Sequence, residues 1–508
     1  MAKTISEKEQ AENEVFETVK AIVEESSLFI GKNTGQAYIT WEESQDVYST
    51  DLINSKEFED KLMVLCIETK NRLYDSKFIG KLVKYIHAHA IAGGVKKEIY
   101  SRIAMIEDKI IYNLSNENKG YIMVSPSAIK QINDVDLVGM DCAFLNNELM
   151  GPQVFPLRKK GNNLCDLLYP FLNLNDDAKK LLVVCLVAWF IRDIPKAVFL
   201  FQGEQGSGKT FLTSLVQRIV DPVKHDVLYM PETKEDLGVA LSTHYVMAVD
   251  NISSLPKGVS DLLCQASTGG SMLKRTKYSN FNASVVTFKN CVLLNGISID
   301  NARLDLRDRI VGFELPTLHN KYCSAKELEE QFDEKLPYIM GEIFRVLKEA
   351  MNIHETLKPM ASARLIDFFN WGRAIAIALF GSDEEFTRIF LENKGFVFEE
   401  LIEVDPLGHA FKIYLESITQ FPHKVNASEL FVKLNKIAQG NHINTTSVNW
   451  VTSPGELSNK LKRLLEAFRG MGYEVDISST NKSNGIRYIK IGKIAPVTVS
   501  SSAADGET

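Results

Sequence analysis

One string of eight residues restricts the fold of this chain more than any other feature. Residues 203–210 read Gly-Glu-Gln-Gly-Ser-Gly-Lys-Thr, which fits the phosphate-binding loop pattern G-x-x-x-x-G-K-[ST] at every fixed position. The apolar run 197–201 precedes the string, and residues 211–216 follow with helical spacing. The loop is therefore predicted to lie between a buried strand and a helix, which is the context that the motif requires.

The residue types in this loop suit a nucleoside triphosphate. Glycines let backbone N–H groups wrap phosphates, and a helix N-terminus adds a favourable field. Lys209 is expected to reach the β- and γ-phosphates of ATP, and Thr210 to hold Mg2+. The alternative is a glycine-rich turn that binds nothing. The expected nucleotide contacts are Gly203, Gln205, Gly206, Ser207, Gly208, Lys209, Thr210 and Phe211.

Composition is that of an ordinary soluble globular protein, with 45% hydrophobic and 24% charged residues among 508. The seven cysteines are scattered without a C-x-x-C pair, which indicates neither a zinc site nor a disulfide framework and fits a cytoplasmic location. The longest apolar run, 181–191, is too short to span a bilayer, so we expect a buried helix there and no membrane partner.

Charge is distributed unevenly along the chain. The formal net charge is −7, yet residues 424–493 hold eleven Lys and Arg against five Asp and Glu, a local charge of +6 that leaves −13 for the remainder. One basic module on an acidic body predicts a local anion-binding surface.

The order of predicted elements divides the chain into an N-terminal α+β accessory domain, an α/β core, a helical region, a small basic α/β module and a disordered tail. In the first domain, residues 37–41 read as a strand and 76–92 as a helix with Ser76 as its cap. The predicted boundaries are 1–145, 146–316, 317–404, 405–493 and 494–508.

Within the core, two further strand ends carry candidate site residues. The strand 245–249 is followed by Asp250, whose carboxylate could hold the magnesium through water. An additional strand, 226–230, lies between this strand and the loop in sequence, which favours an AAA+ arrangement. Asn295 ends the strand 291–294 and could orient the attacking water, or it could simply form an Asn-Gly turn with Gly296.

Three arginines are candidates for stabilising charge on the γ-phosphate. Arg303 and Arg309 precede a strand and could reach across a subunit interface, and Arg364 could contact nucleotide from the helical lid. The alternative for each is a solvated ion pair. The residue after Asp250 is Asn251 rather than Glu, so the general base is expected to be Glu204 or Asp250 itself.

Two segments indicate DNA as a partner. Residues 268–288 are predicted to form a β-hairpin carrying Lys274, Arg275 and Lys277, which could track a phosphate backbone or merely decorate the surface.

The basic module has the helix–helix–hairpin order of a winged helix, with helices at 428–439 and from a capping box at Ser453. Such a module binds duplex DNA or another protein, and its charge favours DNA. The expected DNA contacts here are Lys460, Lys462, Arg463 and Lys482.

The motif series as a whole resembles a known family. In order, G-E-Q-G-S-G-K-T, V-D-N-I-S-S-L-P, S-D-L-L-C-Q-A-S-T-G-G, L-L-N-G-I and R-L-D-L-R-D-R are similar to the AAA+, MCM-like (presensor-1 hairpin) self-loading replication helicases of phages and staphylococcal mobile elements. The resemblance implies a homo-hexameric ring that hydrolyses ATP to move on single-stranded DNA. It also implies a pore hairpin over residues 273–288. Its residue roles are Walker A for Lys209 and Thr210, Walker B for Asp250, sensor 1 for Asn295, the arginine finger for Arg309 and sensor 2 for Arg364.

One departure from MCM proper is the short gap between Thr210 and Val246, which leaves no room for a helix-2 insertion. The sequence therefore predicts an ATP-dependent DNA helicase acting in the replication of a phage or mobile element. The alternatives are an origin-binding initiator that melts DNA without processive unwinding and a nucleotide-switched DNA-binding regulator.

Overall fold

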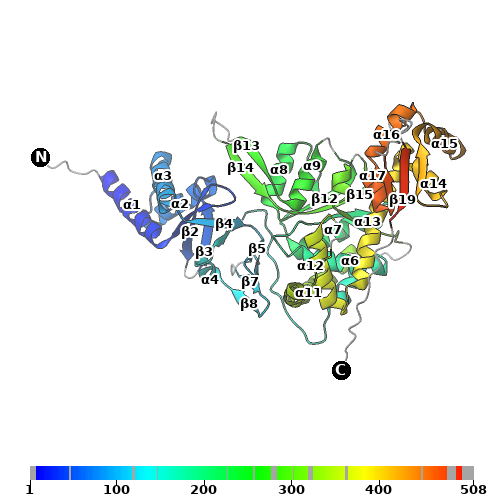
Figure 1. Ribbon diagram of the computed structural model, residues 1–508. Coiled ribbons are helices and arrows are strands. Elements are labelled where there is room, and N and C mark those ends of the chain that lie inside the picture. Colours follow the sequence, from blue (N-terminus) through cyan, green and yellow to red (C-terminus); the bar gives the residue numbers. More distant parts are fainter. Residues whose placement is uncertain are drawn as a thin grey trace, which may run out of the picture.

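The computed structural model describes most of the chain, and its domains follow one another along an elongated body (Figure 1). The described residues are 7–44, 47–116, 120–145, 147–225, 227–255, 258–275, 283–300, 302–318, 324–360, 364–447, 450–477 and 488–494. The N-terminal helices lie at one end, a central parallel sheet in the middle, and the basic module at the other end. None of the described helices is both long and apolar enough to cross a membrane.

The N-terminal part contains a five-stranded mixed sheet in the order β3-β2-β1-β4-β9, with three helices packed on it. Its helix α3 is capped by Asp75, which accepts the N–H of Phe78, and not by Ser76 as the sequence suggested, because Asp75 is the last residue with extended backbone. The elements are α1 (Glu7–Glu25), β1 (Ser27–Gly31), β2 (Ala37–Ser44), β3 (Val47–Leu52), α2 (Lys56–Lys70), α3 (Ser76–Gly93), β4 (Lys96–Tyr100), α4 (Asp134–Val138) and β9 (Cys142–Phe144).

A second, four-stranded antiparallel sheet joins this part to the centre. Its strands are β5 (Ile103–Ile106), β6 (Lys109–Asn113), β7 (Tyr121–Val124) and β8 (Ile129–Ile132). Ile110, Tyr112 and Val124 on one face belong to the same apolar core as Leu182 and Phe344 of the central domain. The predicted boundary at residue 145 therefore does not coincide with a division in packing, because alternate residues of this sheet are buried against helices far along the chain.

The central sheet is five-stranded and parallel, in the order β11-β12-β15-β10-β16. Alternate residues point into two different cores: Phe199 and Phe201 into one, Val198 and Leu200 into the other. Both faces are thus buried, as expected of an all-parallel sheet. The strands are β10 (Val198–Gln202), β11 (Leu228–Tyr229), β12 (Val246–Ser254), β15 (Cys291–Asp300) and β16 (Ile310–Glu314).

Helices cover both faces of this sheet (Figure 1). A hairpin of β13 (Gly270–Arg275) and β14 (Ala283–Phe288) projects from it, so the predicted hairpin is present, although its turn lies outside the described residues. The helices are α5 (Leu164–Leu168), η1 (Tyr169–Phe171), α6 (Asp176–Ala188), α7 (Lys209–Val220), α8 (Lys234–Thr243), α9 (Val259–Thr268), α10 (Leu304–Arg307), α11 (Ala325–Thr356), α12 (Ile366–Phe380) and α13 (Glu384–Val404).

The basic module packs four helices around its own apolar core and a small antiparallel sheet in the order β17-β19-β18. The capping box predicted at Ser453 is not formed: Glu456 accepts the N–H and hydroxyl of Thr452, and Ser453 makes no capping bond. The elements are α14 (Pro406–Glu416), β17 (His423–Asn426), α15 (Ala427–Gly440), α16 (Pro454–Lys462), α17 (Leu465–Gly470), β18 (Tyr473–Asp476) and β19 (Tyr488–Lys493).

Candidate nucleotide-binding site

The glycine loop (residues 203–210) connects β10 to the N-terminus of α7, as the sequence predicted. Gly203, Gly206 and Gly208 have φ angles of 151°, 84° and 88°, in the range that favours glycine. A Cβ on Gly203 would also lie 2.6 Å from the carbonyl oxygen of Leu315. The glycines are therefore required by the backbone path of the loop.

Three polar side chains meet at this loop. Lys209 Nζ donates to the carbonyl oxygens of Gly203 and Glu204, each at 2.8 Å, which holds the ammonium inside the loop. Burial lowers the pKa of Lys209, and the charge of Asp250 opposes that shift. Thr210 Oγ1 donates to Asp250 Oδ2 at 3.0 Å, so a hydroxyl and a carboxylate lie side by side. Mg2+ prefers oxygen ligands, so the hydroxyl of Thr210 and the carboxylate of Asp250 fit that ion.

The strand β15 lies between β10 and β12 and places Asn295 beside Asp250 on the neighbouring strand. The buried Asn295 accepts the N–H of Asn251 at 2.9 Å and donates to Thr213 Oγ1 at 2.8 Å. Asn251 has a φ of 56° where the register of β12 shifts. Both strands continue beyond the residues at which they were predicted to end, β12 past Asp250 and β15 past Asn295. Asn295 thus supports the backbone beside the carboxylate. Its expected action on the attacking water stays a prediction.

The other expected loop contacts are placed less centrally. Glu204 Oε2 accepts from Thr317 Oγ1 at 3.1 Å, which ties the exposed side of the loop to the segment after β16. The Ser207 hydroxyl is buried and has no hydrogen-bond partner among the residues that the structure describes, and Gln205 is exposed. Phe211 packs against the larger apolar core.

Two of the three candidate arginines, Arg309 and Arg364, lie at the opposite end of the central strands from the glycine loop. Arg309 directly precedes β16, whose first residue pairs with Val198, whereas the loop follows Gln202 at the other end of β10. The two ends of β10, five residues long, are about 13 Å apart. Arg364 forms ion pairs with Asp305 and Asp308, at this same far end. Within this chain Arg364 is engaged by these two carboxylates, and its expected contact with nucleotide stays a prediction.

Asp305 is the residue that brings two of these arginines together. It pairs with Arg309 at 3.0 Å and with Arg364, while Arg303 pairs separately with Asp261. Burial tends to raise the pKa of Asp305, but hydrogen bonding and charge from Arg309 and Arg364 outweigh it, so the net shift is downward. The side chain of Arg309 is only 10% exposed, against 41% for Arg364 and 63% for Arg303.

Helix α13 holds this edge of the sheet in place. Asn393 donates to the carbonyl oxygen of Gly312 and accepts its N–H, at 2.7 and 3.0 Å. Lys394 Nζ donates at 2.8 Å to the carbonyls of Asp308 and Ile310, on either side of Arg309. These two side chains take the place of a neighbouring strand along β16, a role that the sequence did not reveal.

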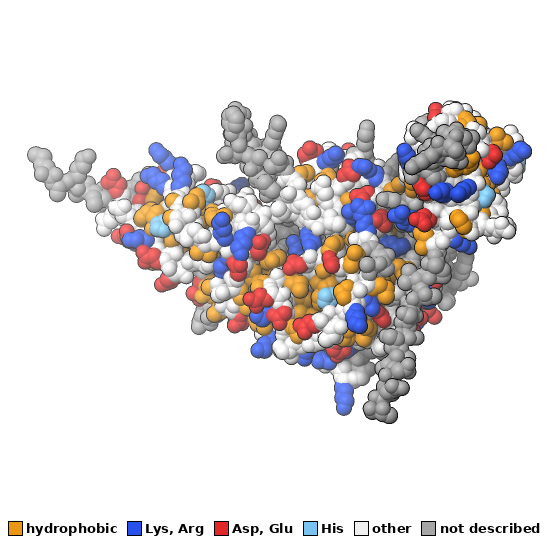
Figure 2. Space-filling view, in the orientation of Figure 1, with side chains coloured by type: hydrophobic (Ala, Val, Ile, Leu, Met, Phe, Trp, Pro, Cys, Tyr) orange, Lys and Arg blue, Asp and Glu red, His pale blue; other side chains and the backbone are white. Residues whose placement is uncertain are grey.

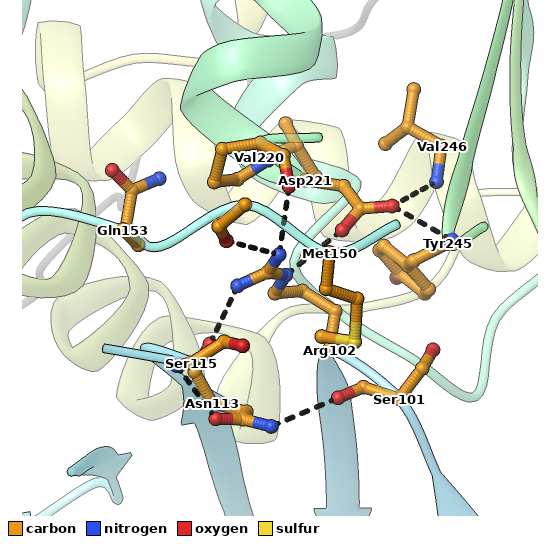
Figure 3. A network of polar contacts seen from close by, with 12 residues as sticks. Ser101, Arg102, Asn113, Ser115, Met150, Gln153, Val220, Asp221, Tyr245 and Val246 are labelled. Carbon is orange, nitrogen blue, oxygen red and sulfur yellow. Dashed lines mark hydrogen bonds and ion pairs between the residues drawn. The ribbon is translucent and has the colours of Figure 1, made fainter. Parts of the chain in front are cut away.

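A buried ion pair supports the other end of the strand that carries Asp250 (Figure 3). Asp221, which caps the end of α7, accepts the N–H groups of Tyr245 and Val246 at the start of β12. Its second oxygen accepts from Arg102 Nε at 2.8 Å, and both side chains are at most 3% exposed. The guanidinium also donates to the carbonyls of Asn113, Gly151 and Pro222. Sequence analysis missed this pair because its members are far apart in the chain.

The structure describes the side chains of only some of the predicted DNA contacts. Lys274 and Arg275 occupy the last two positions of β13, and Lys277 and Lys482 lie outside the described residues. Lys460 donates to the carbonyl of Trp450, and Arg463 to Asp405, which caps α14. Lys460 and Arg463 are therefore engaged within the basic module, with 28% and 38% of their side chains exposed, and Lys462 is exposed. Contact of these residues with DNA stays a prediction.

Two protein-family models match parts of this chain. Residues 165–375 match the family model of the actinomycete integrative conjugative element replication protein, and residues 410–503 match the AICE RepA C-terminal domain. The first match contains the glycine loop, Asp250, Asn295 and all three arginines. No curated protein matches the chain.

Several solved structures are similar at low identity. The apo A form of the NrS-1 C-terminal region is 12% identical with a TM-score of 0.42, over 94% of this chain and 99% of that chain. The structure described as SCCmec type IV Cch, active helicase, is 11% identical with a TM-score of 0.43, over 92% of this chain and 93% of that chain.

Proposed function

We propose that this chain is an ATP-dependent DNA helicase of the AAA+ class that acts in the replication of a mobile genetic element. The observation that carries the proposal is the meeting of Lys209, Thr210 and Asp250 at the glycine loop, within residues that match a replication protein of an integrative conjugative element. The strand order supports the AAA+ class, because β15 separates the strand of the loop from the strand of Asp250.

The chemistry proposed for this site is hydrolysis of ATP with Mg2+. Lys209 would exchange its two carbonyl partners for β- and γ-phosphate oxygens, and Thr210 and Asp250 would hold the ion. When bound, the ion would neutralise charge on the phosphates. Asp250 and Glu204 remain the candidates for the base, because the residue after Asp250 is an amide, Asn251.

The position of the arginines supports a site shared between subunits. Arg309 cannot reach the loop of its own chain across the length of β10, so its expected action requires the loop of a neighbouring protomer. Within one protomer, Asp305 occupies Arg309 and Arg364. A γ-phosphate presented by the neighbour would compete with this carboxylate for the same two guanidinium groups. A closed ring, which we take to be a hexamer, gives every loop such a neighbour.

DNA would be moved by the hairpin and bound by the C-terminal module. The hairpin of β13 and β14 ends in the basic pair Lys274 and Arg275, and a ring would direct six such hairpins toward one channel. The helices α14 to α16 and the sheet β17-β19-β18 have the order of a winged helix, for which we propose duplex DNA as the partner.

A subunit-mixing experiment tests the shared site. Lys209→Ala and Arg309→Ala homomers should each lose ATP hydrolysis. An equal mixture should recover about a quarter of wild-type activity, because one interface in four then combines an intact loop with an intact arginine. Arg388→Ala, which removes an exposed ion pair, is the matched control and should keep full activity. An Arg309→Ala homomer with normal hydrolysis would refute the shared site.

Two DNA assays separate the alternatives. A helicase should hydrolyse ATP faster with single-stranded DNA and displace a strand from a fork that lacks any origin sequence. An initiator should melt only its own origin, and a nucleotide-switched regulator should show no DNA-stimulated hydrolysis.

A further inference from the structure

The helix α3 of the N-terminal domain has one apolar face and one basic face. Its basic face carries Lys77, Lys81 and Lys84, all exposed, and Ser76–Gly93 contains no acidic residue. Within the described part of the chain, these three lysines form no ion pair or hydrogen bond. The opposite, buried face consists of Phe78, Ile79, Leu82, Val83, Ile86 and Ala90.

Two lysines elsewhere in this domain, by contrast, are paired with carboxylates. Lys61 pairs with Glu43 and Asp51, and Lys70 pairs with Glu14. The neighbouring helix α1 carries seven glutamates and two lysines. Like charges at spacings of three and four residues repel each other on a helix, so an external anion bound at this face would stabilise α3.

The hairpin lies against the same domain. The turn after β1 is held by Asn33, whose side chain exchanges two hydrogen bonds with the backbone of Ile99, at 2.7 and 3.2 Å. The carbonyl oxygen of Asn33 accepts from Thr287 Oγ1 of β14 at 2.9 Å. Helix α3 packs on β1 and β2, so the hairpin, this turn and the helix form a continuous series of contacts.

The basic face of α3 and the hairpin lie on the same side of the molecule (Figure 1). In Figure 1, α3 and the hairpin rise from the same upper edge of the molecule, and in Figure 2 Lys and Arg side chains gather over α3. DNA held at the hairpin would therefore pass this face.

We propose that Lys77, Lys81 and Lys84 form a nucleic-acid-binding surface that contacts the phosphate backbone of DNA approaching the hairpin. This inference rests on the proposed function. The spacing suits the partner: residues 77 to 84 rise about 10.5 Å along the helix axis, and phosphates of one DNA strand follow each other about every 3.4 Å along its axis. The three charges thus span about four successive phosphates.

The test uses the full-length protein with Lys77→Gln, Lys81→Gln and Lys84→Gln combined. Glutamine keeps the length and helix propensity of lysine and removes the charge. The matched control replaces the exposed Lys159, Lys160 and Lys358 with Gln. Fluorescence anisotropy with a labelled single-stranded oligonucleotide, and separately with a labelled duplex, gives affinity across a series of salt concentrations.

The α3 variant should bind about tenfold more weakly at low salt, and its slope of log K against log salt should shrink by about 2 for single strands or about 3 for duplex. A loss confined to one probe identifies which form of DNA contacts α3, and the control should match wild type. Wild-type affinity and slope with both probes would overturn the inference while leaving the helicase proposal intact. A wild-type protein that binds neither probe would end both. Basal hydrolysis of ATP without DNA should be unchanged in the variant, which shows that it is folded.

Discussion

Replacing Arg102 with Met should destabilise the protein strongly, although the residue lies far from the glycine loop in sequence. The guanidinium is fully buried and donates one hydrogen bond to Asp221 and three to backbone carbonyls. Its removal leaves a buried carboxylate without its cation, which costs about 3–5 kcal/mol. With a urea dependence of about 3 kcal/mol per M, the midpoint of unfolding should fall by about 1–1.7 M.

Urea titration followed by tryptophan fluorescence measures this shift, because Trp189 is buried in the same core. Asp221→Asn should be similarly harmful, since one amide oxygen replaces two carboxylate oxygens that accept three N–H groups. The double variant should be less harmful than the sum of the two by about 1–3 kcal/mol. Arg388→Met, at an exposed ion pair, should change stability by less than about 1 kcal/mol. If Arg102→Met shifts the midpoint no further than this control, the stabilising role assigned to the buried pair is wrong.

Three further predictions concern the central sheet. Gly296→Ala should lower the free energy of unfolding by more than about 2 kcal/mol in urea titrations, because the new Cβ would lie 1.9 Å from the Ile252 carbonyl oxygen. Gly440→Ala is the control and should be tolerated, because a Cβ there has no atom within 4 Å. Asp250→Asn should keep ATP affinity without metal but lose its increase with Mg2+, as measured by nucleotide titration with and without the ion; an unchanged increase would remove Asp250 from the metal site. Burial lowers the pKa of Lys394 to about 8. Above that pH the unfolded chain still binds a proton that the folded chain has lost. The free energy of unfolding should therefore rise by up to about 1.4 kcal/mol per pH unit until about pH 10. Lys394→Met should flatten this rise in urea titrations at pH 7 to 10, and an unaltered pH profile would contradict the assignment.

Some features of the site could be predicted from local sequence because they are local in physical origin. The glycine loop needs left-handed backbone at Gly206 and Gly208, and only a glycine-rich string permits it at low cost. Asp250 was located because an apolar strand precedes it, and parallel strands place their carboxyl ends at one edge of a sheet. The β-rich arms within residues 268–288, on either side of a polar turn, likewise predicted the hairpin.

Other features depend on which distant segments meet. Sequence could not show that Arg364 lies beside Asp305, or that Lys460 and Arg463 are engaged within their own module. A charged side chain looks the same in sequence whether its partner is water or a residue more than fifty positions away.

By itself, the sequence determined the local backbone of the glycine loop, the strands around it and the uneven charge of the chain, because these depend on residue types at short spacing. Only the tertiary structure decided that the sheet β5–β8 shares the central core and that Arg102 reaches Asp221. It also decided that Arg309 and Arg364 lie at the other end of the central strands from the loop. The reason is that strand order and helix packing, which bring these residues together, arise from the summed burial of many apolar side chains and not from any short pattern.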